Sequence, residues 1–341
     1  MTSIPPVPAR YPCDPEDKGF DLAYGGIRDE LERVEEQLAS WSRSANPLTD
    51  EVSRYVLRKK GKRLRPALVL LTSRLFPGGN EEAVFLAALV ELLHTASLIH
   101  DDIVDNAGIR RGRESVHSRW GPNITVLLGD YLYIKSIGLS LRSGQGRIVR
   151  ILADVSSRMI EGELDEYALG GSLAASEDEY LRVIENKTAA LFSCCCRFGA
   201  ILGGAGPDEE ERLAGFGLNL GMSFQLVDDL LDLEGEPGAL GKPVLSDLGE
   251  GRMTLPLIHA LQANGRVRPE RLMGLIGRKD LSGSEREGLL KDLVAGGSLD
   301  YTRARARDYL ERSLDLLLRF PGSPCREALA RLAACVLHRD R

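Results

Sequence analysis

The chain has no excess of basic residues, no long uninterrupted apolar run and no paired-cysteine motif, and each absence excludes a class of protein. With 44 Lys and Arg against 50 Asp and Glu, the net charge of −6 argues against a general nucleic-acid-binding protein. The apolar stretch 83–99 is interrupted by Glu91 and His94, so we expect no membrane span. The N-terminus is rich in proline but has no apolar signal-peptide core, which predicts a loosely held leader over residues 1–23.

The cysteines lack the spacing of a zinc site or of a disulfide framework. No C-x-x-C occurs, and the adjacent residues Cys194, Cys195 and Cys196 would face three directions on a helix. We interpret them as small, buried and reduced side chains, which predicts a cytoplasmic protein. The other three cysteines are Cys13, Cys325 and Cys335.

Runs of alternating polar and apolar residues are also lacking, and helical periodicity dominates the sequence. A chain of 341 residues with 43% hydrophobic content can bury a large core, and no change of composition divides it after residue 20. We therefore predict a single all-α domain over residues 24–341, a bundle of long helices around a central cavity. Ser176 and Glu179 form the pattern of a capping box at the start of the seventh helix. The predicted helices cover residues 24–42, 47–59, 65–76, 81–105, 124–141, 147–169, 176–202, 207–233, 255–263, 284–295, 299–320 and 324–338.

Two copies of one acidic pattern, Asp-Asp-x-x-Asp, end two of the apolar helices, at residues 101–105 and 228–232. Residues four apart share a helix face, so each motif directs its first and last carboxylates the same way. Two carboxylates about 5 Å apart repel each other by on the order of 3 kcal/mol at an effective dielectric of roughly 20, unless a cation lies between them. Oxygen ligands without Cys favour Mg²⁺, which takes one or two carboxylates together with water and phosphate oxygens. One such motif is compatible with a solvated helix end, whereas two on apolar helices indicate a metal site.

Basic segments flanked by glycine accompany these motifs. One contains Lys62 and Arg65, and another follows the first acidic motif and contains Arg110 and Arg111. Arg binds phosphate oxygens in pairs and Lys adds a point charge. A basic loop alone is usually solvated surface, but beside a carboxylate cluster it predicts a phosphate group held from both sides. Further polar candidates are His94, Lys187, Thr188, Gln225 and Lys242, although a lone His on an apolar helix is more often a structural residue.

Together and in this order, the motifs resemble those of the trans-isoprenyl diphosphate synthases, or polyprenyl synthetases. The resemblance covers about residues 25–338 and implies the isoprenoid-synthase fold, usually as a homodimer. It also implies Mg²⁺, three ions in each active site, and head-to-tail condensation of isopentenyl diphosphate onto an allylic diphosphate. The motifs that carry it are Gly61-Lys62-x-x-Arg65-Pro66, His94, Asp101-Asp102-x-x-Asp105, Arg110-Arg111-Gly112, Lys187-Thr188, Phe224-Gln225-x-x-Asp228-Asp229-x-x-Asp232 and Gly241-Lys242-Pro243.

The resemblance implies a role for each matching residue. The Mg²⁺ ligands would be Asp101, Asp105 and Asp228, and the aspartates acting behind them or through water would be Asp102, Asp229 and Asp232. The residues that bind isopentenyl diphosphate would be Lys62, Arg65, His94 and Arg111. The residues that bind the allylic diphosphate would be Arg110, Lys187, Thr188, Gln225 and Lys242. Charge on the departing diphosphate would be neutralised by the metal together with Arg110, Lys187 and Lys242, and no protein nucleophile is required.

The sequence departs from the family pattern at two positions. Where the pattern has Glu-x-x-Gln, residues 163–166 read Glu-Leu-Asp-Glu and place Glu166 last. The Lys that precedes the Thr-Leu-Pro segment is Arg252 here, which keeps the charge and joins the substrate-binding residues. The role of Glu166 stays open.

Two rival interpretations are weighed against a synthase. A class I terpene cyclase shares the fold and the first motif but usually has an Asn/Ser/Glu motif in place of the second aspartate cluster. A non-catalytic partner subunit typically lacks aspartates that are all present in this chain.

The residues before the first motif predict the length of the product. Ser97 and Ala96, four and five residues before Asp101, are both small, where short-chain relatives often have an aromatic side chain. The prenyl tail of an allylic diphosphate bound at the first motif would pass Ser97 and Ala96 about 6–7.5 Å along the helix axis and would reach Leu93. We therefore predict a long-chain synthase of heptaprenyl or octaprenyl type, with a farnesyl or geranylgeranyl synthase as the alternative. Small residues also permit close helix packing, and the facing helix offers Ile134, Ile137 and Gly138 to close the tunnel.

Overall fold

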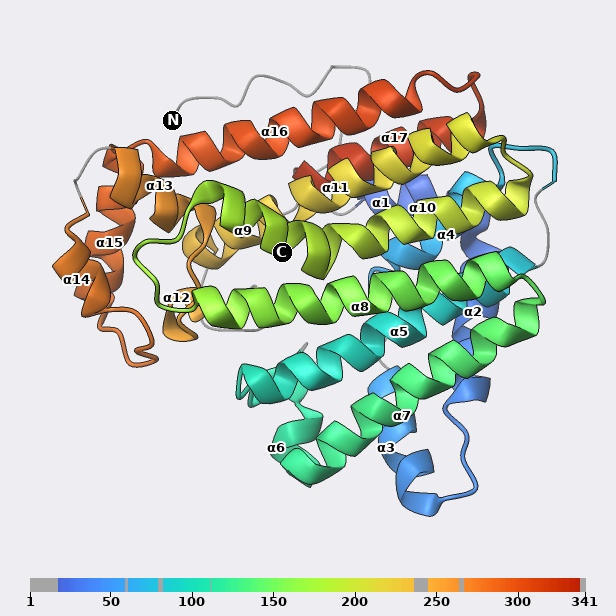
Figure 1. Cartoon of the computed structure of the whole chain (residues 1–341), viewed down its shortest axis with the longest axis horizontal. Helices are drawn as coiled ribbons and strands as arrows, with labels where there is room; N and C mark the ends of the chain where they lie inside the picture. Colours follow the sequence, from blue (N-terminus) through green and yellow to red (C-terminus); the bar gives the residue numbers. More distant parts are fainter. Residues whose placement is uncertain are drawn as a thin grey trace.

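The computed structural model describes residues 18–58, 61–78, 82–110, 112–235, 245–263 and 267–337. They form a bundle of α-helices with one short β-hairpin, each strand of which has two residues (Figure 1). The prediction of an all-α fold is confirmed. The helices are α1 (Lys18–Tyr24), α2 (Arg28–Trp41), α3 (Pro47–Leu57), α4 (Leu64–Ser73), α5 (Glu82–Val104), α6 (Val116–Trp120), α7 (Pro122–Ser140), α8 (Gly146–Leu169), α9 (Glu177–Ile184), α10 (Ala190–Gly203), α11 (Pro207–Glu234), α12 (Ser246–Gly249), α13 (Leu255–Ala263), α14 (Pro269–Met273), α15 (Gly283–Ala295), α16 (Ser298–Leu317) and α17 (Pro324–Leu337). Shorter elements are the 3₁₀ turns η1 (Gly25–Ile27) and η2 (Leu141–Ser143), the π-helix η3 (Glu185–Ala189) and the antiparallel strands β1 (Ile109–Arg110) and β2 (Arg113–Glu114).

Helix α5 lies inside the bundle because it is apolar on nearly all sides. Residues 86–93 are almost completely buried, and the helix packs against α2, α4, α7 and α10. A helix at the surface would show one apolar stripe and a polar face. The burial of α5 therefore holds its C-terminal end, with the first aspartate motif, within the molecule.

Helix α11 carries the second aspartate motif and packs tightly against α10 and η3. A Cβ atom on Gly217 would lie 2.5 Å from the carbonyl oxygen of Phe192, and one on Gly221 would lie 2.6 Å from the Cα of Ala189. These glycines allow the backbones to approach at distances that no side chain would permit. Because α10 also packs against α5, the two aspartate motifs are brought to one region of the bundle.

Two helices in the described part of the chain are long and apolar enough to cross a membrane by length and composition alone. The apolar window of Glu82–Val104 is 72% buried in the protein, as befits a core helix. The window of Pro122–Ser143 is only 39% buried, so this helix leaves an apolar face exposed. One or two such helices are weak evidence for a membrane span, and α5 is accounted for by the core.

The structure differs from the predicted helices in several places. Helix α1 begins at Lys18, within the range predicted as a leader, and packs against α17. The helix predicted over 176–202 is divided by the π-helix η3, although its capping box at Ser176 is confirmed. Helices of five residues or fewer, such as α6, α12 and α14, are not predicted, because they span less than two turns and show no detectable hydrophobic periodicity.

The described cysteines agree with the interpretation of small core residues. Cys194, Cys195 and Cys196 are buried in α10, and burial raises the pKa of each thiol. Cys335 is buried and Cys325 partly buried. Cys13 lies outside the described residues, as do Arg111 and Lys242.

Candidate active site

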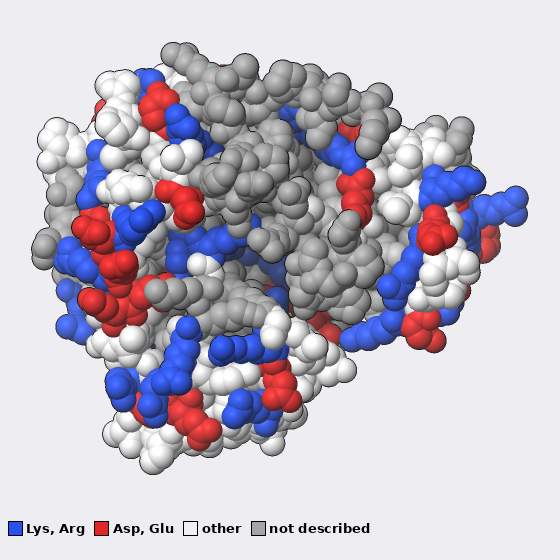
Figure 2. Space-filling model, turned by 180° about the vertical axis from the view of Figure 1, so that it is seen from behind, with Lys and Arg blue, Asp and Glu red and all other residues white. Residues whose placement is uncertain are grey.

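A cavity of about 1300 Å³ brings together most of the predicted site residues. Figure 2 shows a face of the molecule that is hollowed near its middle, with basic side chains inside the hollow. Among the described residues, those of the predicted set that line the cavity are Lys62, Arg65, His94, Ser97, Asp101, Asp105, Arg110, Lys187, Thr188, Gln225, Asp228, Asp229 and Arg252. Asp102, Asp232 and Ala96 do not line it.

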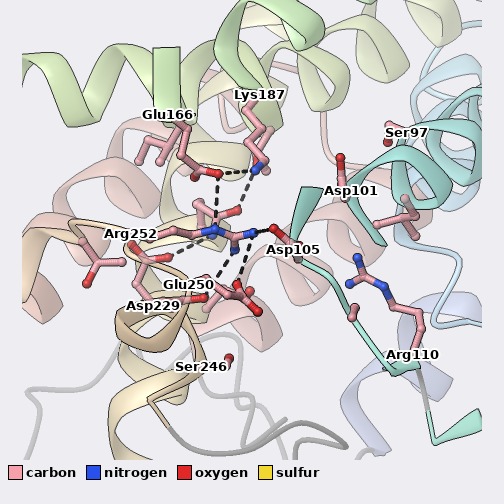
Figure 3. Close-up of a pocket in the computed structure, with 18 of the residues that line it drawn as sticks. Ser97, Asp101, Asp105, Arg110, Glu166, Lys187, Asp229, Ser246, Glu250 and Arg252 are labelled. Carbon is pink, nitrogen blue, oxygen red and sulfur yellow. Dashed lines mark hydrogen bonds and ion pairs between the residues drawn. The ribbon is translucent and has the colours of Figure 1, made fainter. Parts of the chain in front are cut away.

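The first motif directs Asp101 and Asp105 into the cavity from the end of α5 (Figure 3). Burial raises the pKa of Asp101 to about 7; Lys187 opposes the shift and Glu163 adds to it. Asp102 turns the other way and accepts a hydrogen bond from Nε of Arg110 at 2.6 Å. The pKa of Asp101 is therefore raised mainly because the carboxylate is buried, and its charged neighbours partly offset one another.

The second motif divides its carboxylates between the cavity and the protein interior. Asp228 and Asp229 line the cavity, but Asp229 is nearly completely buried and accepts hydrogen bonds from Tyr180 and from Gln225. Burial, with Asp247 nearby, raises its pKa. Asp232 accepts hydrogen bonds from the backbone N–H groups of Ser246 and Asp247, at 3.2 and 3.1 Å, and so caps α12. Asp232 therefore supports the fold of the cavity wall.

The basic turn before α4 is anchored by a residue that the sequence analysis did not select. Arg63 has a left-handed backbone with φ of 53° and is buried. Its guanidinium donates to Glu35 of α2, at 2.5 and 3.0 Å, and to Glu91 of α5. This anchoring places its neighbours Lys62 and Arg65 in the cavity wall.

Arg65 contacts a second predicted residue across the turn. Its Nη1 lies 3.0 Å from Nε2 of His94, and its guanidinium lies 4.8 Å from the ring centre of Phe192. The hydroxyl of Tyr24 donates to the carbonyl oxygen of Lys62 at 2.7 Å. The three predicted residues Lys62, Arg65 and His94 thus form one patch on the cavity wall.

Another wall of the cavity holds a network of charged residues (Figure 3). The ammonium of Lys187 lies 2.6 Å from Glu163 and 2.5 Å from Glu166, and Arg252 contacts Asp105 and Glu166. Burial alone would lower the pKa of Lys187, but the Glu166 and Glu163 carboxylates raise it above its ordinary value. The two positions at which the sequence departs from the family pattern, 166 and 252, therefore contact each other.

Lys187 and Thr188 lie on the π-helix η3, whose extra residue changes the direction of its side chains relative to a regular helix. Gly162 of α8 makes room for it, since a Cβ there would lie 2.6 Å from the backbone nitrogen of Lys187. Thr188 donates to Gln225 at 2.9 Å, which in turn donates to Asp229. The π-helix thus joins the basic wall to the second aspartate motif.

The structure corrects the assignment of Ala96 to the cavity. At 100° per residue, Ser97 lies 40° from the direction of Asp101 around α5, whereas Ala96 lies 140° away. Ala96 is accordingly fully buried in the core, as is Leu93, while Ser97 lines the cavity. Ile134, proposed to close the tunnel, is 73% exposed and points to solvent.

The donor chemistry of the cavity fits a divalent cation shared with phosphate. No group of three or more His, Cys, Asp or Glu side chains in the described part of the chain comes close enough to hold a metal alone. Mg²⁺ commonly takes one or two carboxylates and completes its octahedron with water and substrate phosphates. Asp101, Asp105 and Asp228 on two walls of one cavity match that requirement.

Comparison with known proteins identifies the family. The family model of polyprenyl synthetases matches residues 46–293. The chain is 35% identical to the octaprenyl diphosphate synthase of Escherichia coli (strain K12), over 86% of this chain and 91% of that one. It is 36% identical to the short chain isoprenyl diphosphate synthase of Methanothermobacter thermautotrophicus, over 84% and 89%.

The solved structures agree with this comparison. The polyprenyl synthase of Caulobacter crescentus CB15, complexed with calcium and isoprenyl diphosphate, superposes with a TM-score of 0.89 at 33% identity, covering 94% of this chain and 98% of that one. With the motifs, the fold and the family model in agreement, this chain belongs to the polyprenyl synthetase family and is a prenyltransferase.

Proposed function

We propose that the cavity condenses isopentenyl diphosphate head to tail onto an allylic diphosphate, with Mg²⁺, three ions per site, held by Asp101, Asp105 and Asp228. The observation that carries the proposal is the meeting of both aspartate motifs and two separate sets of basic residues in one cavity. When bound, the metal supplies positive charge to the diphosphate leaving group. The protein is proposed to be cytoplasmic, in keeping with the burial of four of its five described cysteines and the lack of a C-x-x-C motif in the sequence.

The chain's own residues account for the remaining chemistry. Lys187, Arg252 and Arg110 place fixed positive charge where the departing diphosphate develops negative charge. Apolar side chains complete the lining and exclude water that would quench an allylic cation; among them are Leu98, Met159, Leu169, Val183 and Phe224. The proton released on condensation is accepted by the diphosphate, so no protein base is required.

The proposal is tested with the chain purified alone. Incubation of one allylic diphosphate with and without isopentenyl diphosphate should give a longer prenyl diphosphate only when both are present. A product from the allylic substrate alone would indicate a cyclase. No product from either incubation would indicate a subunit that needs a partner.

The two basic sets should affect different substrates. Lys62→Ala or Arg65→Ala should raise KM for isopentenyl diphosphate, and Lys187→Ala should raise KM for the allylic substrate. The expected change is roughly 10- to 100-fold, since a hydrogen bond to a charged group contributes about 1.5–3 kcal/mol. Steady-state kinetics with each substrate varied in turn measures it, and equal effects on both substrates would contradict the division.

We propose a long-chain product, supported by the small side chain of Ser97 on the cavity face of α5. Octaprenyl and short-chain synthases are similarly close in sequence to this chain, so the product itself must be analysed. Ser97→Phe should shorten the product by one or more isoprene units, because its ring would enter the cavity. Chromatography of products from farnesyl diphosphate and excess isopentenyl diphosphate is the measurement.

Ala96→Phe is the matched comparison, because Ala96 faces the core instead of the cavity. If only Ser97→Phe shortens the product, the growing prenyl chain lies along the cavity face of α5. If both variants shorten the product, the prenyl chain lies deeper beside α5. A wild-type product that stops at farnesyl or geranylgeranyl length would contradict the long-chain assignment.

We propose a homodimer that covers the apolar face of α7, η2 and α8. This α7–α8 face consists of side chains between 51% and 78% exposed, namely Leu127, Ile134, Leu141, Ile160, Leu164 and Tyr167. They recur every three, four or seven residues, and α7 packs against α8 at the front of Figure 1. A second copy of the chain would remove this surface from water.

Light scattering after size-exclusion chromatography tests the dimer. Ile134→Asp should convert it to a monomer, because a buried carboxylate without a partner is strongly unfavourable in an apolar interface. Leu22→Asp is the control, because the Leu22 side chain on α1 is exposed, and this variant should leave the mass unchanged. A wild-type monomer would refute the proposed interface.

A further inference from the structure

One carboxylate oxygen in the cavity lies between two cations from different elements. Oε2 of Glu166, near the end of α8, accepts a hydrogen bond from Nζ of Lys187 on η3 at 2.5 Å. The same oxygen lies 3.3 Å from Nε of Arg252, in the segment between α12 and α13. Figure 3 shows Lys187 and Arg252 converging on this carboxylate.

Lys187 and Arg252 each contact other carboxylates, but none of these other carboxylates contacts both cations. Lys187 also contacts Glu163, one turn earlier on α8, at 2.6 Å. Arg252 also contacts Asp105, Asp247 and Glu250. Within the described part of the chain, Glu166 is therefore the one carboxylate that joins Lys187 to Arg252.

We propose that Glu166 is a positioning residue that holds Lys187 and Arg252 side by side for the allylic diphosphate. The inference rests on the proposed function, which assigns both cations to that substrate. Two neighbouring cations repel each other, and a shared carboxylate oxygen offsets that repulsion before the substrate arrives. Lys has three N–H donors and Arg five, so each keeps donors for phosphate oxygens while bound to Glu166.

A neutral amide could not replace this carboxylate. The Gln side chain has the same shape and could place its carbonyl oxygen between the two cations, but it carries no negative charge to offset their repulsion. In Glu166→Gln, Lys187 would keep Glu163 and Arg252 would keep its three other carboxylates, so the fold should hold. The two cations would separate toward these other partners, and the diphosphate would have to bring them together again.

Glu166→Gln should therefore raise KM for the allylic diphosphate about tenfold, the lower end of the loss typical when a group that orients a binding residue is removed. KM for isopentenyl diphosphate should change little, because Lys62 and Arg65 do not contact this network. Calorimetry with inorganic pyrophosphate and Mg²⁺ should show a matching loss of affinity. Glu166→Asp keeps the charge but shortens the side chain by one methylene, so we expect an intermediate loss.

Glu163→Gln is the matched control, since it neutralises the other carboxylate on Lys187 and leaves the Glu166 bridge intact. It should raise the allylic KM less than Glu166→Gln does. Equal effects of the two variants, an unchanged allylic KM, or tighter pyrophosphate binding by Glu166→Gln would overturn the inference. Equal rises of KM for both substrates, with a lowered Tm, would indicate a purely structural role. If the wild-type chain made no prenyl diphosphate, the proposed function would fail first.

Discussion

Asp101→Ala and Asp228→Ala should each lower kcat by about a hundred- to a thousandfold, since losing stabilisation of developing charge commonly costs about 3–4 kcal/mol. Both carboxylates line the cavity, one from α5 and one from α11. Each substitution would therefore remove one proposed metal ligand. The helices should remain folded. Burial raises the pKa of Asp101 to about 7, so this carboxylate is already unfavourable as a charged group in the folded chain.

Three measurements test the prediction: turnover, helical content by far-ultraviolet circular dichroism, and binding of Mg²⁺ and pyrophosphate by calorimetric titration. The titration should show weaker binding in both variants, independently of activity. Asp154→Ala on the exposed side of α8 is the control for removal of a carboxylate. Near-normal turnover of a folded Asp101→Ala or Asp228→Ala variant would contradict the proposed metal site.

The sequence predicts where the cavity forms because its strongest signals are local. An apolar helix ending in Asp-Asp-x-x-Asp can be recognised from periodicity alone, and two of them suffice to predict a shared carboxylate site. The angular positions of Asp101 and Ser97 on α5 follow from 3.6 residues per turn. The same geometry turns Ala96 away, although sequence proximity suggested otherwise.

The roles of individual residues depend on tertiary contacts that no local pattern contains. Asp105 and Asp232 occupy equivalent places in their motifs, yet Asp105 lines the cavity and Asp232 caps α12. The difference arises because the chain returns to α11 at Leu245, whose N–H donates to the carbonyl oxygen of Asp232 at 2.8 Å. Glu166 likewise meets Arg252 across 86 positions of sequence, a contact that one sequence alone does not reveal.

Arg63 should prove a sensitive position for stability. Its side chain is 7% exposed and faces Glu91, whose side chain is 5% exposed, with Glu35 completing the group. Arg63→Ala would leave the buried Glu91 carboxylate without its cation, and losing one partner of a buried pair typically costs about 3–5 kcal/mol. Chemical denaturation should show that loss. Arg54→Ala, which removes a partly exposed pair with Asp50 one turn away on α3, should cost only about 0.3–0.5 kcal/mol.

A double substitution at Arg63 and Glu91 should separate the effect on stability from the effect on substrate binding. In Arg63→Met/Glu91→Leu, apolar side chains replace the buried pair, and much of the stability should return, since such replacements are often neutral or favourable. The turn would still lack its anchor to Glu35, so Lys62 and Arg65 would be held less firmly and KM for isopentenyl diphosphate should stay raised. Recovery of both stability and KM in the double variant would show that Arg63 only fills the core. A raised KM in a stable double variant would show that the buried ion pair holds the basic turn in place for the substrate.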